Sequence, residues 1–182
     1  MIVPHRIFLD TGVVQYLLRY GEAVFENAAL PNDNRLNEIP GGLADVEALR
    51  RFCFVNQRNA FELVVSDNSV KEVLAAGEPK FASWLMVLMD YWYTIQASYA
   101  GSVVNGAGAA KRARLTARQF GYLSDKDRAL VADACEMECD TFLTVDRRLA
   151  RNAEHLRRAV GMSIVTPTSL WDILEPWAGL LP

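Results

Sequence analysis

Short apolar runs alternate along this chain with longer segments in which apolar residues recur at helical spacing. Four runs have the length and composition of buried strands, and they cover residues 6–9, 62–66, 141–145 and 162–165. Because each run is largely apolar rather than alternating, the pattern favours strands covered on both faces, as in a parallel sheet. We therefore predict the α/β class, as a three-layer α/β/α sandwich with a central, mostly parallel sheet.

Helical segments are predicted between and after these strands. They cover residues 11–20, 43–58, 68–76, 124–138, 146–158 and 168–174. Two regions interrupt the alternation, because 26–42 is rich in turn-forming residues and 99–120 joins a stretch of small residues to a basic stretch. We predict both regions as insertions in a single domain that spans residues 1–182, since a chain of this length can bury one hydrophobic core.

Composition and charge are those of an ordinary globular protein. The 182 residues are 51% hydrophobic and 23% charged, which is typical of a folded domain. The net charge of −3 argues against a protein that coats nucleic acid, although local basic patches can still contact phosphates. Three cysteines without CxxC spacing are typical of a reducing compartment, so we predict a cytoplasmic protein. Cys135 and Cys139 share a helical face, where core packing is favoured over a metal-binding pair.

Residues 81–100 form a segment that is apolar on nearly all sides and about as long as a membrane span. Asp90 lies near its centre, where a charge in lipid is costly. We therefore predict a buried or subunit-interface helix, with a homodimer as a candidate assembly and no contact with a membrane. The aromatic cluster Tyr91, Trp92 and Tyr93 would suit such an interface.

Four acidic residues stand where the predicted sheet would bring them to one edge, and they are Asp10, Glu72, Asp127 and Asp146. Asp10 and Asp146 directly follow predicted strands, and ligands of doubly wound sheets bind outside the carboxyl ends of the strands. Gathered carboxylates repel one another and resist burial, so a compensating charge is required. Mg²⁺ and Mn²⁺ prefer oxygen ligands, and we predict one of these ions as the cofactor.

Length and helical phase select Asp127 among several nearby acids. A helix that runs about 17 Å down from Asp127 and a strand that climbs about 20 Å back to Asp146 return both residues to the same edge. Asp125 and Glu136 lie opposite Asp127 on the helix, and Asp133 lies to one side. The third acid of the predicted site is therefore Asp127.

Two of the four acids have an alternative explanation as helix caps. Ser69 and Glu72 match a capping box, and Ser124 with Asp127 nearly matches one. Either acid would then satisfy amides in the first turn of its helix, which is worth about 1 kcal/mol. The other two acids repeat one strand–Asp–helix arrangement, so the combination of four indicates a metal site more strongly than any single residue.

The segments that contain these acids resemble the PIN-domain nuclease family, which includes the VapC-type toxins of bacterial toxin–antitoxin pairs. The matching segments are FLDTGVVQYLL, VVSDNSVKEVL, SDKDRALVADACEMECDTFLTVDRRL and SIVTPTSLWDIL. They cover both ends of the chain and most of its middle, and the third segment is the most specific. The resemblance implies a PIN-like fold.

The resemblance also implies a catalytic quartet that binds Mg²⁺ or Mn²⁺, made of Asp10, Glu72, Asp127 and Asp146. Thr11 and Thr144 would help to orient carboxylates, substrate or water. The implied reaction is hydrolysis of single-stranded RNA, leaving 5′-phosphate and 3′-hydroxyl ends. Some relatives carry a further acid after the fourth position, where this chain has Arg147 and Arg148. We predict that these two arginines contact RNA phosphates.

Three hypotheses follow for function. The primary one is a metal-dependent endoribonuclease, with the toxin half of a type II toxin–antitoxin pair as its candidate biological role and an antitoxin protein as candidate partner. The alternative is a non-catalytic PIN-like module that binds RNA or a protein partner through residues 81–99. An aspartate-nucleophile phosphatase is disfavoured, because such sites require a second Asp two residues after the first, where this chain has Gly12.

Overall fold

A four-stranded parallel sheet forms the centre of the molecule. The computed structural model describes residues 3–30, 34–59, 61–75, 83, 86–87, 90, 107–116 and 118–179. The strands are β1 (Arg6–Leu9), β2 (Glu62–Val64), β3 (Thr141–Leu143) and β4 (Ser163–Val165), in the spatial order β2-β1-β3-β4. All three strand pairs are parallel, with Phe8 opposite Val64 on one side and Phe142 on the other. The predicted sheet is therefore confirmed.

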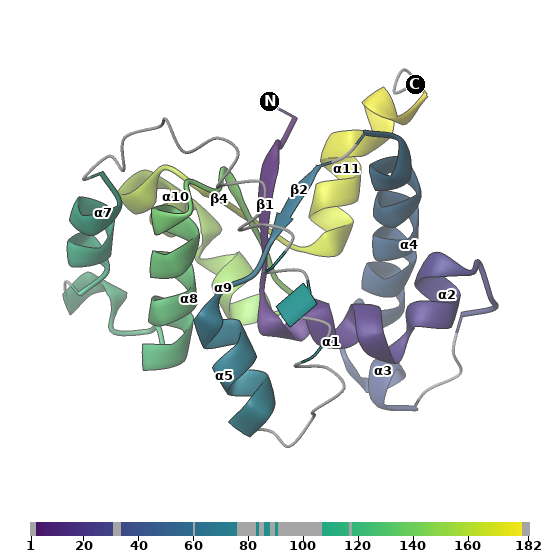
Figure 1. The fold of residues 1–182 in the computed structure, drawn as a ribbon, viewed down its shortest axis with the longest axis horizontal. Coiled ribbons are helices and arrows are strands. Elements are labelled where there is room, and N and C mark those ends of the chain that lie inside the picture. The colour runs from purple at the N-terminus through teal and green to yellow at the C-terminus, as the bar shows by residue number, and fades with distance from the viewer. Residues whose placement is uncertain are drawn as a thin grey trace.

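Helices connect the strands and cover both faces of the sheet (Figure 1). Among the described residues, those before β3 are α1 (Thr11–Arg19), α2 (Gly21–Phe25), α3 (Asn34–Glu38), α4 (Gly42–Asn59), α5 (Asp67–Ala75), α7 (Ala107–Leu115), the 3₁₀ turn η1 (Arg118–Phe120) and α8 (Asp125–Glu136). After β3 come α9 (Arg147–Arg151), α10 (Ala153–Val160) and α11 (Pro167–Ala178). The strand–helix alternation accounts for the parallel sheet, because parallel strands require crossover connections.

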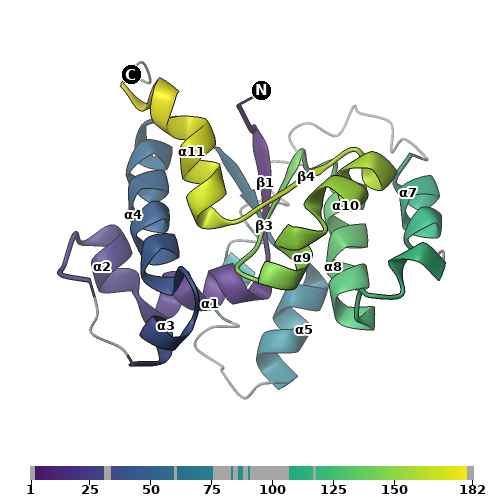
Figure 2. The ribbon, with the colours of Figure 1, turned by 180° about the vertical axis from the view of Figure 1, so that it is seen from behind.

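Two apolar cores lie on opposite faces of the sheet, which makes the fold a three-layer α/β/α sandwich. Ile7 and Leu9 point into a core formed with α1, α2, α4 and α11, whereas Phe8 between them points into a core with α7, α8, α9 and α10. Alternate residues of a strand face opposite sides, so one strand serves both cores. The two helical layers stand on either side of the sheet in both views (Figures 1 and 2).

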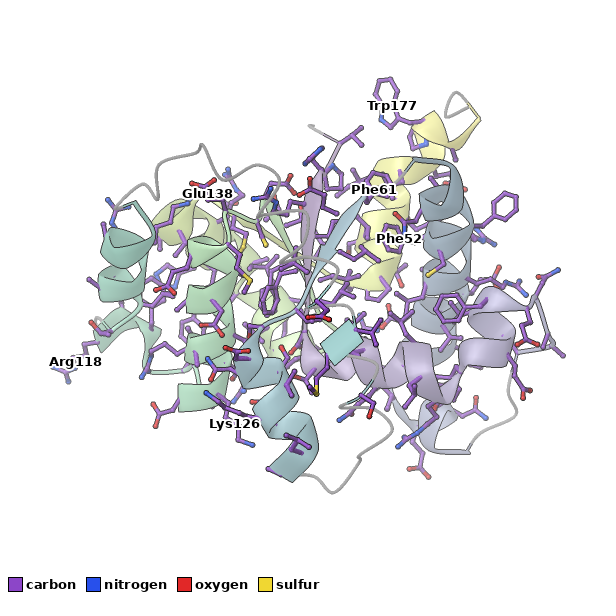
Figure 3. The ribbon with its side chains drawn as sticks, in the orientation of Figure 1. Phe52, Phe61, Arg118, Lys126, Glu138 and Trp177 are labelled. Atoms are coloured by element: carbon purple, nitrogen blue, oxygen red, sulfur yellow. The ribbon has the colours of Figure 1, made fainter. Side chains whose placement is uncertain are left out.

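Aromatic pairs pack in the cores on both faces of the sheet. Phe8 and Phe142 stack across β1 and β3 with ring centroids 5.2 Å apart. On the other face, Phe52 of α4 stacks on Phe61, next to β2, at 5.6 Å (Figure 3). Trp177, near the end of α11, is instead 46% exposed. Such pairs contribute about 0.5–1.5 kcal/mol beyond their burial.

Three predicted segments differ in detail from the structure. The helix predicted over 146–158 is divided into α9 and α10, because the Asn152 side chain donates to Arg148 O (2.8 Å) and ends the first helix. The turn-rich region 26–42 contains the short helix α3, which buries Leu36 against α4. In the region 99–120, the basic stretch begins on a helix, α7.

Other predictions concern burial and membranes. Cys135 and Cys139 are free thiols buried in the core, as predicted, but they do not share a helix, because α8 ends at Glu136. The apolar segment 81–100 lies outside the described residues, apart from residues 83, 86, 87 and 90. Among the helices of the described ranges, none has both the length and the apolar character to span a membrane.

Candidate functional site

The turns that follow β1 and β3 lie side by side, because these two parallel strands are neighbours in the sheet. Asp10 N donates to Leu143 O at 3.0 Å, which extends the strand pairing to the first residue of the turn. Asp10 is the N-cap residue of α1, yet its side chain makes no capping hydrogen bond. The Asp10 carboxylate is therefore available to groups of the neighbouring turn.

Thr144 joins the two turns through one hydroxyl group. Its Oγ1 donates to Asp10 Oδ2 at 2.5 Å and accepts a hydrogen bond from Asp146 N at 3.0 Å. Because Thr144 is fully buried, this hydroxyl has a fixed position. Asp10 and Asp146 are thus held in register by a residue that stands between them, which fits the orienting role predicted for Thr144.

Gly12 allows this close approach of the two turns. A Cβ atom at residue 12 would lie 2.8 Å from Val145 Cγ2, closer than side-chain carbons pack. The absence of a side chain therefore lets the first turn of α1 lie against the β3–α9 connection. This is also the position at which an aspartate-nucleophile site would require its second Asp, so packing as well as residue type disfavours that chemistry.

Glu72 reaches the same edge from α5. Thr11 Oγ1 donates to Glu72 Oε2 at 2.8 Å, which links the first turn of α1 to α5. The helix begins at Asp67, so Ser69 lies within it and hydrogen-bonds with Ser66 instead of starting the helix. The alternative explanation of Glu72 as part of a capping box that begins at Ser69 is therefore wrong.

Asp127 combines a capping role with a contact to α9. The capping box with Ser124 forms, because Ser124 N donates to Asp127 Oδ2 and Asp127 N donates to Ser124 Oγ, both at 3.1 Å. The same Oδ2 accepts from Arg148 Nη2 at 2.7 Å. The capping alternative is thus confirmed for Asp127, and it leaves the carboxylate facing α9.

Asp146 caps α9 while remaining near the same arginine. Its Oδ1 accepts from Arg148 N at 2.6 Å and from Leu149 N at 3.4 Å. Its Oδ2 lies 3.6 Å from Arg148 Nη2. The Arg148 guanidinium group therefore stands between the carboxylates of Asp127 and Asp146.

Burial and two neighbouring carboxylates raise the pKa of the Asp10 carboxyl group. Burial, together with the charges of Asp127 and Glu72, raises the pKa of Asp10 from its ordinary 3.8 to about 6, against the opposing hydrogen bonds from Thr144 and the Thr11 backbone. Asp10 thus lies in the electrostatic field of Glu72 and Asp127, which come from two other segments of the chain.

The donor chemistry of this edge fits a hard divalent cation. Carboxylates and threonine hydroxyls supply only oxygen atoms, which Mg²⁺ and Mn²⁺ prefer. Within the part of the chain that the structure describes, however, no three His, Cys, Asp or Glu side chains converge into a group that could hold a metal ion. The quartet is brought to one edge, but the four carboxylates do not meet at a point, and Arg148 separates two of them.

Arg147 points to a different set of partners from Arg148. Its guanidinium group pairs with Asp45 of α4, which is 1% exposed and also accepts from Thr168 N (3.3 Å) and Thr168 Oγ1 (2.7 Å). Burial raises the pKa of Asp45, while Thr168 and Arg147 oppose that change. A Cβ at Gly41 would lie 2.8 Å from Arg147 Nη2, so this glycine makes room for the pair.

Asp45 was not singled out from the sequence. The only local signal is an acid beside the apolar stripe of a predicted helix, which ordinarily indicates a solvated face. Its partners Arg147 and Thr168 lie 102 and 123 residues away in the sequence. The connection between α4, α9 and α11 is therefore a property of the tertiary fold.

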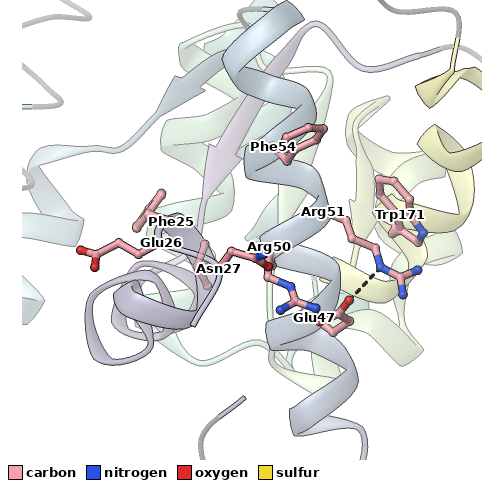
Figure 4. Close-up of a pocket in the computed structure, with 9 residues that line it drawn as sticks. Phe25, Glu26, Asn27, Glu47, Arg50, Arg51, Phe54 and Trp171 are labelled. Carbon is pink, nitrogen blue, oxygen red and sulfur yellow. Dashed lines mark hydrogen bonds and ion pairs between the residues drawn. The ribbon is translucent and has the colours of Figure 1, made fainter. Parts of the chain in front are cut away.

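A cavity of about 530 Å³ lies elsewhere, among α2, α4 and α11 (Figure 4). Phe25, Phe54 and Trp171 line it together with Arg51, which pairs with Glu47 at 3.0 Å. None of the four predicted site acids lines this cavity. The acidic edge and this cavity are thus separate features of the surface.

Comparison of the chain with protein-family models, with curated proteins and with solved structures yields no match.

Proposed function

We propose that this protein is a Mg²⁺- or Mn²⁺-dependent endoribonuclease that hydrolyses phosphodiester bonds of single-stranded RNA. The observation that carries the proposal is the joint placement of Asp10 and Asp146 at the carboxyl ends of adjacent parallel strands, bridged by Thr144. Binding sites of open α/β sheets lie at this edge. Asp10 also lies in the field of Glu72 and Asp127, a charge arrangement that a cation would relieve.

In this proposal, some residues bind the cation and others orient those ligands. Asp10, Glu72, Asp127 and Asp146 would hold the cation, while Thr144 and Thr11 orient Asp10 and Glu72 by donating hydrogen bonds. When bound, the divalent ion would supply an acidified water and neutralise charge on the phosphate. The expected products carry 5′-phosphate and 3′-hydroxyl ends.

The proposed RNA contacts are on α9, beside the acidic edge. Arg147 is held by Asp45, whereas the Arg148 side chain is 49% exposed, so Arg148 is the better placed of the two to reach a phosphate. Contacts of this kind position a strand without reading its sequence.

Cleavage of a labelled single-stranded RNA tests the proposal directly. We expect cleavage with Mn²⁺ or Mg²⁺, none with EDTA, and at least about a 100-fold loss in Asp146→Asn, because metal-site carboxylates act on the transition state. Asp125→Asn is the matched control, since its side chain is 99% exposed and pairs only with Arg128 among the ion pairs described. Equal cleavage by wild type and Asp146→Asn would contradict the assignment.

A non-catalytic module that binds RNA or protein is the second candidate. The observation that favours it is the position of Arg148 between Asp127 and Asp146, because an arginine can neutralise such carboxylates without any metal. Calorimetric titration separates the two, since absence of binding at millimolar Mn²⁺ would favour the module.

We extend the nuclease proposal to a toxin of a type II toxin–antitoxin pair in the bacterial cytoplasm, with an antitoxin protein as partner. Its support is the resemblance of the acid-bearing segments to VapC-type toxins. Induced expression in a bacterial host should arrest growth for wild type and not for Asp146→Asn. Unimpaired growth of cells that contain active nuclease would contradict the toxin role but not the nuclease activity.

A further inference from the structure

Arg148 is bound at both its ends to the acidic edge. Its backbone N–H donates to Asp146 Oδ1 at 2.6 Å, and its Nη2 lies 2.7 Å from Asp127 Oδ2 and 3.6 Å from Asp146 Oδ2. One guanidinium group thus bridges carboxylates from two helices, α8 and α9. The arginine pairs of α10 differ, because they join neighbours on a single exposed helix.

We propose that Arg148 is an internal counter-ion of the acidic site, which a divalent cation must displace before the carboxylates can converge on it. The inference rests on the proposed function, because it supposes that the quartet binds Mg²⁺ or Mn²⁺. It accounts for two facts together: the acids reach one edge, yet the described side chains form no three-ligand group. A guanidinium and a metal ion compete for the same lone pairs of Asp127 and Asp146.

The neighbouring arginine makes such an exchange feasible. Arg147 is anchored to buried Asp45, and Leu149 is buried in the core, so α9 is held from both sides of Arg148. The Arg148 side chain is 49% exposed and can turn toward solvent without moving the helix. Asp146 would keep its capping hydrogen bond to Arg148 N during this change, because that contact involves the backbone.

A released Arg148 would lie next to the bound ion and its substrate. Arginine favours phosphate oxygens, which it can contact in a bidentate manner. The same side chain would therefore shield the acids before the ion binds and contact a phosphate afterwards. The exchange raises the positive charge beside Asp127 and Asp146 by one, because a divalent ion replaces a singly charged guanidinium group.

Calorimetric titration of Mn²⁺ into the full-length chain tests the inference without reference to catalysis. The variants are Arg148→Gln, which removes the counter-ion, and Arg151→Gln, which removes an equal charge from the same helix. Arg151 is exposed and its Nε donates to Arg147 O rather than to a carboxylate. We expect Arg148→Gln to bind Mn²⁺ about three- to tenfold more tightly than wild type, as the loss of one or two partly exposed ion pairs allows. Arg151→Gln should differ from wild type by less than about twofold.

A thermal-shift measurement gives a second readout. Without metal, Arg148→Gln should melt below wild type, because Asp127 and Asp146 lose their counter-ion, and Mn²⁺ should raise its melting temperature more than that of wild type. Equal Mn²⁺ affinity and equal thermal shift in wild type and Arg148→Gln would overturn the counter-ion role while leaving the nuclease proposal intact. Absence of Mn²⁺ binding in every protein would overturn both, and an equal gain in both arginine variants would reduce the effect to net charge.

Discussion

Asp10 is the residue at which the fold and the proposed chemistry meet. It follows β1, starts α1 without capping it, and receives its hydrogen bond from Thr144 instead. Burial and the nearby charges of Asp127 and Glu72 raise its pKa to about 6. A carboxylate in such a position is costly to ionise in the absence of a cation. The cost is what a bound metal ion would remove.

The raised pKa predicts opposite pH dependences for stability and for metal binding. The unfolded chain releases this proton near pH 4 and the folded protein near pH 6, so the contribution of Asp10 to stability falls as pH rises through that interval. Mn²⁺ requires the ionised carboxylate, so its apparent affinity should fall up to about tenfold per pH unit below pH 6. Calorimetric titration of Mn²⁺ between about pH 5 and 7.5, a range that spans the expected transition, measures this change in affinity.

Thr144→Val is the informative comparison for that measurement. The change keeps the shape of a buried side chain and removes the hydroxyl that lowers the pKa of Asp10. The pH at which Mn²⁺ affinity declines should therefore move upward, and urea denaturation should show a loss of about 1–2 kcal/mol. An unchanged pH profile would show that this hydrogen bond does not control the ionisation of Asp10.

At the scale of elements, periodicity and caps accounted for most of the helices and strands. β1 and β4 were found because short apolar runs stand between turn residues, and α8 because Ser124 and Asp127 form a real capping box. The division of α9 from α10 was missed, since it depends on an Asn152 side chain bonding to a carbonyl oxygen four residues earlier. Such local competition between side chain and helix leaves no apolar period to detect.

The candidate site was predictable to the extent that it depends on strand ends. Asp10 and Asp146 follow from the position of two strands, whereas the bond from Thr11 to Glu72 and the bridge of Arg148 depend on how helices pack. Both arginines after Asp146 were assigned to RNA on their charge and their position next to the predicted metal site. Their different partners, a buried acid for Arg147 and the acidic edge for Arg148, could not be read from adjacent positions in the sequence.

The α4–α9 connection carries a prediction at this scale. Asp45→Asn should destabilise the protein by about 2 kcal/mol, because it leaves the partly buried Arg147 without its carboxylate partner. It should also weaken Mn²⁺ binding, since Arg147 anchors the helix that Asp146 caps. Urea denaturation and calorimetry measure the two effects. Asp172→Asn is the control, because Asp172 is an exposed acid on α11 and its loss should change neither.

At the scale of the whole molecule, one sheet serves two cores. Neighbouring residues of β1 point to opposite faces, so neither helical layer can retain its packing when the sheet is lost. The order β2-β1-β3-β4 places β1 and β3 at the centre, and these are the strands whose ends bear Asp10 and Asp146. The acidic edge is thus built on the most enclosed part of the fold, which suits a site whose geometry must be maintained.

Because the cores share the sheet, damage to one should unfold both together. Phe142→Ala removes a fully buried ring that stacks on Phe8, and it should cost about 3–5 kcal/mol. With Trp84 and Trp92 replaced by phenylalanine, tryptophan fluorescence reports on α11, which carries Trp171 and Trp177 in the layer opposite the Phe142 side chain. Circular dichroism at short wavelength reports on all helices. Both signals should shift to lower urea by the same amount, as in a two-state transition.

Phe54→Ala, at a side chain 56% exposed on α4, should leave both midpoints nearly unchanged. Separate transitions for the two signals in Phe142→Ala would show that the layers unfold independently, and the acidic edge would then depend on only one of them.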